Sequence, residues 1–580
     1  MVQGELLILL ATHILLTGLP GVAAALFAAS RRERREPVLL AIALAATGCA
    51  AMLAFWAFYG GHELGQTVSF LIAFGSALLT AWLLYDGGIE RELLRRLAVP
   101  LALWVLGSGF LVFLGFAHGG VHEATQMSGS RFSGPLPSDN DIPHFFSDWF
   151  FVHGHSGTPP IYGNEWLASD RPPLQVGYAN FERTFGWDNL GLHYQVMGVI
   201  LQQLWIVGLW ALLVAGGSSR VTRALAMITV LLSDIAIVNG FFVWPKMLPA
   251  AMLLGAAALV LTPLWSEVRR SLWGAALFAV LLGLAMMGHG ASVFGILPLL
   301  VIGAVRGLPS WRWLGVAVLA GAVLMAPWSA YQQWGDPPGN RLTKWFLGGV
   351  SEIDGRGVGE AIEDSYSESG LSGVIHHKGQ NFVSIFGGRP MADNVDHAVS
   401  AVGNGEFEAA VRPIRSIFFF NLVPSLGLLL LGPVAMAIGW RRRARDPAEW
   451  RLATMCLATF GLGAVLWALI QYGGAVAQTS IHQGSYLLPV IGICGCAVGL
   501  RAVYPRFAFW WLGLNAAAML VIYVPSFEPP AGSSWSVLSL VIAAAALVGF
   551  IVLSLEVGPR RVAPPWSARL RSPALSSSRS

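Results

Sequence analysis

Long apolar runs recur along almost the whole chain, separated by short polar connections. Each run has roughly 18 to 24 residues, enough for a helix to cross a hydrocarbon core of about 30 Å. The pattern predicts an all-α fold, a polytopic transmembrane helical bundle with about fifteen spans. The expected spans are 6–28, 37–59, 68–86, 97–117, 194–216, 224–242, 247–264, 272–288, 291–305, 313–330, 416–440, 452–472, 484–500, 507–524 and 535–556.

The composition agrees with a membrane protein. Of the 580 residues, 55% are hydrophobic and only 12% are charged, and the charged share is about half of that in soluble proteins. The net charge of +4 gives no reason to expect a nucleic-acid partner. Basic residues follow the first apolar run instead of preceding it, which is the reverse of a cleavable signal, so we expect a retained span. The four cysteines lie in apolar runs and are expected to serve in packing.

Positive charges alternate between successive connections. One set of short connections, 60–67, 289–290, 473–483 and 525–534, has no Lys or Arg, and Lys246 is the exception near a turn on that side. The positive-inside rule places the other set in the cytoplasm, with the N-terminus outside and the C-terminus cytoplasmic. The basic residues of the cytoplasmic set are Arg31, Arg32, Arg34, Arg35, Arg91, Arg95, Arg96, Arg220, Arg223, Arg269, Arg270, Arg306, Arg312, Arg441, Arg442, Arg443, Arg445, Arg501, Arg506 and Arg560.

This topology leaves two long acidic and aromatic segments outside, about 118–193 and 331–415. Long loops in compact membrane proteins tend to carry function. The chain is therefore divided into a transmembrane extension (1–96), a core with the first outer loop (97–345), a second outer loop (346–415), C-terminal helices (416–556) and a disordered cytoplasmic tail (557–580).

The first outer loop contains the segment DNDIPHFFSDWF at 139–150. Its aromatic residues recur at helical spacing, while Asp141, His144 and Asp148 share the opposite face. The pattern predicts a helix in the membrane interface, with its carboxylates turned to water or to a cavity above the spans. Asp139 and Asp141 are also suited to cap its N-terminus. The alternative is a surface helix whose acids are merely solvated.

The segment ASDRPPLQVG follows at 168–177. Pro172 and Pro173 fix an extended backbone and so hold Asp170 and Arg171 in a stiff stretch. An outward Arg in a loop poor in cations points to an anionic group, and phosphate suits the guanidinium fork. A surface Asp170–Arg171 pair, or a contact with lipid headgroups, is the alternative.

These motifs resemble the GT-C membrane glycosyltransferases, and above all the branch with lipid A aminoarabinose transferases and protein O-mannosyltransferases. Asp139 and Asp141 match the acidic motif of that family, and DRPPL at 170–174 matches its (E/D)(K/R)PPL element. VWPKML (243–248), GHGASVF (288–294) and the segment 326–345 are also similar to bacterial GT-C proteins. The resemblance covers about residues 97–345. The chain departs from the family in placing about three additional spans before the acidic loop.

The resemblance implies a polyprenyl-phosphate sugar as donor and transfer, with inversion, to a lipid, glycan or protein acceptor outside the membrane. A carboxylate such as Asp141 is suited to act as general base, with Asp139 and Asp170 as further candidate acids. The phosphate leaving group needs no paired general acid. Arg171 and Lys246 are candidates to stabilise its charge. His289 is a further candidate for donor binding, and His144 and Asp148 are candidates for supporting residues, in each case because of their positions in the sequence.

Several alternatives stay open at this point. Lys246 is also explained by snorkelling to lipid headgroups, and His289 by a tight turn without a catalytic role. The histidines of the first loop offer metal-binding spacings, so a divalent metal remains a possible cofactor, with no ligand set assigned. A secondary transporter or flippase, or a lipid-linked polysaccharide ligase or polymerase, would also fit many spans. The high Ala, Gly, Arg and Trp content fits a GC-rich bacterial genome, and we expect the protein in the bacterial inner membrane.

Overall fold

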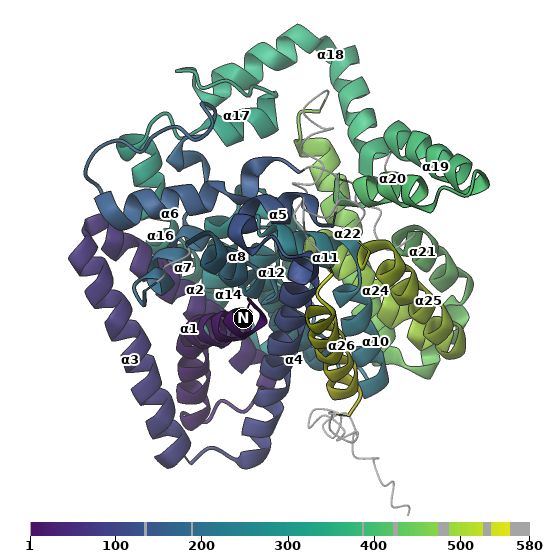
Figure 1. The fold of residues 1–580 in the computed structure, drawn as a ribbon, viewed down its shortest axis with the longest axis horizontal. Helices are drawn as coiled ribbons and strands as arrows, with labels where there is room; N and C mark the ends of the chain where they lie inside the picture. Colours follow the sequence, from purple (N-terminus) through teal and green to yellow (C-terminus); the bar gives the residue numbers. More distant parts are fainter. Residues whose placement is uncertain are drawn as a thin grey trace, which may run out of the picture.

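The computed structural model describes residues 2–86, 88–132, 136–186, 190–385, 388–420, 427–473, 487–525 and 535–556. These residues form helices joined by short connections, without a β-strand, as Figure 1 shows. The predicted all-α class is therefore confirmed. The expected tail at 557–580 lies outside the described residues, as do parts of the expected spans 416–440 and 484–500.

Nine helical segments in the described residues are long and apolar enough to cross a membrane. Their lengths, 19 to 29 residues, match the roughly 20 residues that a bilayer core requires. They are α1 (Val2–Ser30), α2 (Glu36–Gly60), α3 (His62–Asp86), α4 (Arg91–Gly115) with η1 (Phe116–His118), α8 (Leu190–Gln202) with α9 (Trp205–Ala215), α16 (Trp311–Ala330) with η6 (Tyr331–Gly335), α22 (Pro447–Ile470), α25 (Pro505–Tyr523) and α26 (Val537–Glu556).

A tenth span is formed if α10 (Arg220–Leu231) and α11 (Asp234–Phe242), which are bent by 54°, are taken together. The other expected spans coincide with shorter apolar helices: α12 (Met247–Val260), α14 (Leu272–Gly288), η5 (Gly290–Ser292) with α15 (Val293–Val305), and α24 (Leu487–Val503). α21 (Leu428–Ile438) covers part of the expected span 416–440. Length and composition thus support nine or ten spans, fewer than the fifteen expected, because helices of 13 to 17 residues are short for a bilayer of about 30 Å.

Contacts between connections show which of them lie at the same end of the bundle. At one end, Arg35 contacts Glu267 at 2.5 Å and Arg34 contacts Glu90 at 3.8 Å. The Ser219 amide also donates there to Glu449 at 2.8 Å. The members of each of these pairs come from different Arg-rich connections, so these connections lie together as the charge pattern predicts. At the other end, Gln3 donates to Ser536 at 2.9 Å, which places the start of α1 beside the start of α26.

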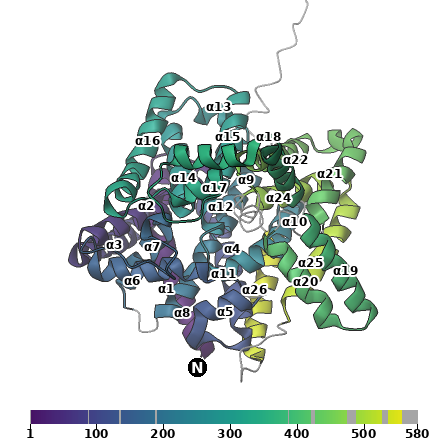
Figure 2. The same cartoon turned by 90° about the horizontal axis from the view of Figure 1, so that it is seen from above.

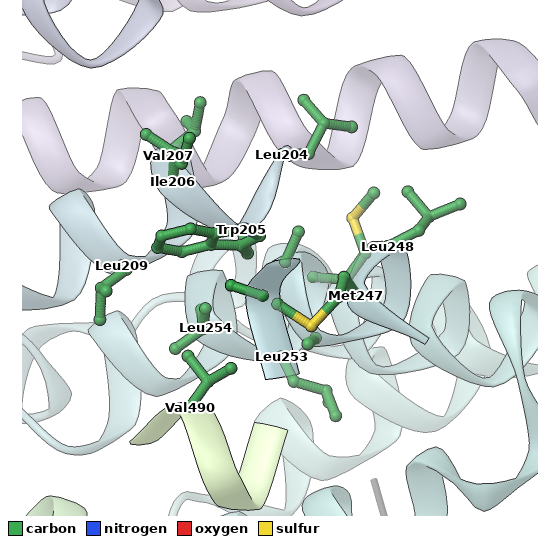
Figure 3. Close-up of a cluster of buried hydrophobic side chains, with 14 of the residues drawn as sticks. Leu204, Trp205, Ile206, Val207, Leu209, Met247, Leu248, Leu253, Leu254 and Val490 are labelled. Atoms are coloured by element: carbon green, nitrogen blue, oxygen red, sulfur yellow. The ribbon is translucent and has the colours of Figure 1, made fainter. Parts of the chain in front are cut away.

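The core lies where α9, α12 and α24 meet. Figure 3 shows Trp205 of α9 among Leu254 of α12 and Val490 of α24, and all three are fully buried. α12 is buried along its whole length and is rich in Ala. Small residues let helix backbones approach closely, which is the main packing device where lipid removes the hydrophobic drive. A Cβ at Gly208 of α9 would lie 2.7 Å from the carbonyl oxygen of Ala251 in α12, so the two backbones touch at this point.

The first three helices pack on the rest of the bundle. α2 contacts α9, α12 and α14, and also α7 (Leu174–Arg183) of the first outer loop. Most of α2 is buried. The expected boundary at residue 96 therefore coincides with no break in packing, although α3 lies at one edge of the molecule in both views (Figures 1 and 2).

Short helices complete the structure. Figure 1 shows α17 and α18 at one edge of the molecule and the adjoining ends of α3 and α4 at the opposite edge. The second loop holds α17 (Arg341–Gly348), α18 (Val358–Ile385), α19 (Gly388–Gly403) and α20 (Phe407–Phe420). The first holds η2 (Val121–Glu123), α5 (Ala124–Ser130), η3 (Ser138–Asn140), α6 (Ile142–His153) and η4 (Ala168–Asp170), ahead of α7. The remaining elements are α13 (Trp265–Val268) and η8 (Trp440–Arg445).

Replacing Gly177 with alanine is expected to displace α7. A Cβ at this position would collide with the carbonyl oxygen of Ala51 in α2, and backbone cannot move aside as a side chain can. We expect a loss of about 1–3 kcal/mol, the usual cost of overpacking. The measurement is the thermal unfolding midpoint in detergent. Gly315→Ala in α16 is the matched control, because nothing lies within 4 Å of a Cβ there. An unchanged midpoint in Gly177→Ala would contradict the close α2–α7 contact.

Candidate functional site

The acidic motif lies at the start of α6, as the sequence predicts. Ile142, Phe146 and Phe150 form the buried face of this helix. Asp139 belongs to η3, and Asp141 occupies the N-cap position of α6 without a side-chain cap hydrogen bond. The carboxylates are therefore not used as caps and remain available for other contacts.

Asp141 faces a small polar group on the exposed side of α6. Its Oδ1 lies 3.3 Å from Nδ1 of His144, whose Nε2 lies 3.9 Å from Asp148. The three side chains thus share one helix face, as expected from their spacing. Asp148 also contacts Arg183 at 2.5 Å. The side chain of Asp141 is 35% exposed, so a ligand in solution can reach its carboxylate.

Tyr162 lies beside both acids of the motif. Burial raises the pKa of its hydroxyl group, and the negative charges of Asp141 and Asp139 raise this pKa further. The ring packs on Phe145 of α6 at 5.2 Å between centroids. An aromatic hydroxyl thus joins the acidic pair, and no sequence motif signalled it.

Arg171 points into the protein toward Asp139. Its Nη2 lies 3.6 Å from Oδ1 of Asp139, and only 7% of its side chain is exposed. Its guanidinium group stacks 3.9 Å above the ring of Trp166 and lies 5.8 Å from that of Trp244. Burial lowers the pKa of Arg171, while the charges of Asp139 and Asp170 oppose this shift. The alternative of an exposed Asp170–Arg171 pair does not describe this arrangement, because Arg171 is buried against Asp139.

Asp170 pairs with a residue of the second outer segment. Its Oδ2 lies 3.5 Å from Nη1 of Arg341 and accepts the Leu167 amide at 3.0 Å. Its side chain is 1% exposed. Burial raises the pKa of Asp170, and the Leu167 amide and the charges of Arg341 and Arg171 counteract this shift.

A second contact holds the same stretch of backbone. The Ser169 amide donates to Oδ2 of Asp336 at 2.8 Å, and Gln332 donates to the Ser169 carbonyl at 2.9 Å. Asp336 and Arg341 bracket the segment DPPGNR, which by sequence predicts only a turn. The structure assigns these two residues to the wall of the site. Asp336 and Arg341 are far from the DRPPL element along the chain, so no local sequence pattern predicted this contact.

Lys246 and His289 come together from different connections. Nζ of Lys246 lies 2.7 Å from Nε2 of His289, and both residues are buried. Nδ1 of His289 accepts the Ala291 amide at 3.0 Å, so in the neutral ring Nε2 carries the hydrogen and donates it to the amine. Burial lowers the pKa of Lys246 well below its usual value, and the charge of Arg171 lowers it further. Snorkelling to lipid headgroups, the alternative, would leave this side chain exposed.

Three basic side chains alternate with two indole rings in this region. Arg341 lies 4.3 Å and Arg171 3.9 Å from Trp166, while Lys246 lies 4.1 Å from Trp244. We call these five residues the cation–indole row. Cations over indole faces are held in position by the ring quadrupole. Two carboxylates, those of Asp139 and Asp170, lie among these three basic side chains, and the charge of Asp139 acts on both Arg171 and Lys246.

The other histidines of the first loop point elsewhere. His155 lies with Nδ1 at 3.0 Å from the Tyr59 carbonyl, and His153 stacks on Trp149 at 4.1 Å between ring centroids. Within the described ranges no three His, Cys, Asp or Glu residues are grouped to hold a metal ion. A cleft of about 830 Å³ lies between α19 and α20, lined by Asn394, His397, Glu406, Phe407, Glu408, Ala409 and Arg412, and shares no residue with the row.

Comparisons with protein-family models, with curated proteins and with solved structures give no match for this chain.

Proposed function

We propose that this protein is a GT-C-type membrane glycosyltransferase, which transfers a sugar from a polyprenyl-phosphate donor to an acceptor outside the membrane with inversion. The observation that carries this proposal is the meeting of Asp139, Arg171, Lys246 and His289 at one end of the bundle. They come from three connections that are far apart in sequence. Acidic and basic groups that converge beside apolar spans suit a substrate with a lipid tail and a phosphate.

The residues divide into roles by their contacts. Asp139 already contacts Arg171 and so orients it, whereas Asp141 is more exposed and is reached by an acceptor hydroxyl, whose proton it takes as general base. Arg171 and protonated Lys246 stabilise the charge that develops on the leaving phosphate. Asp170 acts through Arg341 as a positioning residue. His144 and Asp148 support Asp141 from the same helix face.

The substitution Asp141→Asn tests directly whether Asp141 is the general base. Purified protein in nanodiscs is given radiolabelled polyprenyl-phosphate sugars, and transfer and donor binding are measured separately. We expect Asp141→Asn to lower kcat by about 10²–10⁴-fold, the usual contribution of a general base, with donor affinity kept. Glu123→Gln is the matched control, because Glu123 is an exposed acid of the same loop that has no assigned role. Unimpaired transfer in Asp141→Asn would remove this residue from the mechanism.

Donor binding is expected to depend on pH through Lys246. The lowered pKa of Lys246 means that the amine is neutral above this pKa and carries its charge only below it. An anionic donor favours the charged form, so its Kd should fall as pH decreases and proton uptake should accompany binding. Titration calorimetry in two buffers of different ionisation enthalpy measures this uptake. Lys246→Met should abolish it, and the same proton uptake in Lys246→Met as in the wild type would count against the assignment.

One observation favours a transporter as the second candidate. The span made of α10 and α11 is broken and bent by 54°, with Asp234 buried at the break. Discontinuous helices with buried acids occur at the substrate sites of secondary transporters. Uptake of a lipid-linked sugar into liposomes without any chemical transfer would support this function instead. Transfer in detergent, where no compartment exists, would support the glycosyltransferase.

We also propose the number of membrane spans and their orientation. If the four shorter apolar helices and the region around α21 also cross the bilayer, the chain has the fifteen spans expected from its apolar runs, an odd number that agrees with its charge pattern. We place the Arg-rich end in the cytoplasm and the cation–indole row outside, in a bacterial inner membrane. A cysteine-accessibility scan of both ends tests this orientation.

A further inference from the structure

A second group of buried polar side chains surrounds the end of α25 and includes none of the residues of the cation–indole row. Arg131, which follows α5, is 1% exposed. Its Nη2 donates to the carbonyl oxygens of Leu114 at 3.2 Å and Val524 at 3.0 Å. Arg415 of α20 donates through Nε to the carbonyl oxygen of Ile522 at 2.8 Å. Two guanidinium groups therefore lie around residues 522–525.

Several buried polar atoms in this group have no hydrogen-bond partner among the described residues. Nε and Nη1 of Arg131 are buried and have no hydrogen-bond partner within the described ranges, and the same holds for Nε2 of His118 and the hydroxyl group of Tyr523. His118 ends η1 and stacks on Trp535, with 3.5 Å between ring centroids. Trp535 lies just ahead of α26. The leftover donors thus come from the outer ends of α4 and α25 and from the loop after α5.

Helix capping explains only part of this arrangement. The carbonyl groups at the ends of α4 and α25 carry partial negative charge and suit a nearby cation. They account for Nη2 of Arg131, but they leave the Nε and Nη1 donors on either side of it unmatched, and a buried charge is costly unless it is paired. Burial, together with the nearby charge of Arg415, lowers the pKa of Arg131 to about 9.

We propose that Arg131, His118 and Tyr523 bind a phosphate group where the membrane meets the solution on its outer side. This group is either the headgroup phosphate of an anionic lipid or free phosphate. Nε and Nη1 of Arg131 lie on either side of Nη2, and each can donate one charge-assisted hydrogen bond to a phosphate oxygen. His118 and Tyr523 supply further donors, and Arg415 adds positive charge. Cations at the outer end of a span depart from the positive-inside rule, and a bound anion gives a reason for them.

The test uses the full chain in detergent with three probes: phosphatidylglycerol, phosphatidylcholine and inorganic phosphate. Native mass spectrometry counts bound molecules, and a thermal unfolding curve is recorded with each probe. We expect phosphatidylglycerol to be retained more than phosphatidylcholine and to raise the unfolding midpoint. Arg131→Gln should weaken its apparent affinity by about tenfold or more, the loss of one charged hydrogen-bonding group. Arg412→Gln is the matched control, because Arg412 lies in α20 with 53% of its side chain exposed.

Each outcome bears on the proposal. Stabilisation by inorganic phosphate alone, lost in Arg131→Gln, identifies the free ion as the ligand, whereas selectivity for phosphatidylglycerol identifies the lipid. Equal retention of both lipids with no effect of phosphate overturns the proposal, as does an unchanged affinity in Arg131→Gln. If that variant does not fold, Tyr523→Phe removes one donor while keeping the ring, and should weaken binding by a few-fold. Sugar transfer is not needed for any of these readouts.

Discussion

Replacing Arg171 with glutamine will lower kcat/KM for the polyprenyl-phosphate sugar by about 10²–10³-fold, as expected when one preorganised charge-stabilising group is lost. The guanidinium group is buried, stacked on Trp166 and oriented by Asp139, so it is held in place before the substrate arrives. Glutamine keeps hydrogen-bond donors but removes the positive charge. The measurement is initial-rate transfer from a radiolabelled donor in nanodiscs, together with a direct binding curve.

Arg183→Gln is the control for this experiment. Arg183 also pairs with an acid of the first loop, Asp148, and stacks on Phe151, and among the described residues it does not contact the cation–indole row. Its kcat/KM should stay near the wild-type value. If Arg171→Gln retains full activity while the donor still binds, Arg171 does not stabilise the leaving phosphate and the proposed site is wrong.

Replacing Arg341 with methionine is expected to destabilise the protein and to distort the site. The change leaves the buried carboxylate of Asp170 without its partner, and breaking a buried pair in this way costs about 3–5 kcal/mol. It also frees the backbone of Glu165, whose carbonyl accepts from Arg341. We expect a lower unfolding midpoint and a loss of donor affinity, because Arg171 follows Asp170 directly.

The loss of stability in Arg341→Met is expected to depend on pH. Loss of Arg341 should raise the pKa of Asp170 further above that of the unfolded chain. The folded state then binds a proton more readily, so the stability deficit is small at low pH and grows as pH rises through the raised pKa. Unfolding midpoints at pH 5 and pH 8 measure the difference. The double variant Asp170→Asn/Arg341→Met should recover much of the loss, and a purely additive loss would show that the two side chains are not coupled.

Hydrophobic patterning alone predicted the helical class and the places of most helices, because a chain in lipid must satisfy its backbone groups within helices. The alternation of arginines predicted that several connections lie at the same end, and the contacts of Arg35 with Glu267 and of Arg34 with Glu90 agree with this. The spacing within 139–150 predicted that Asp141, His144 and Asp148 share a face. These are local properties, and a sequence contains them directly.

Pairing between distant segments was decided only by the tertiary structure. By sequence Asp170 and Arg171 are neighbours, yet the fold turns one to Arg341 and the other to Asp139. Lys246 and His289 meet because α11, α12 and α14 bring two connections to the same end. Helix length likewise decided how many spans are supported. Such contacts depend on how buried charges find partners in three dimensions, which the order of residues along the chain does not express.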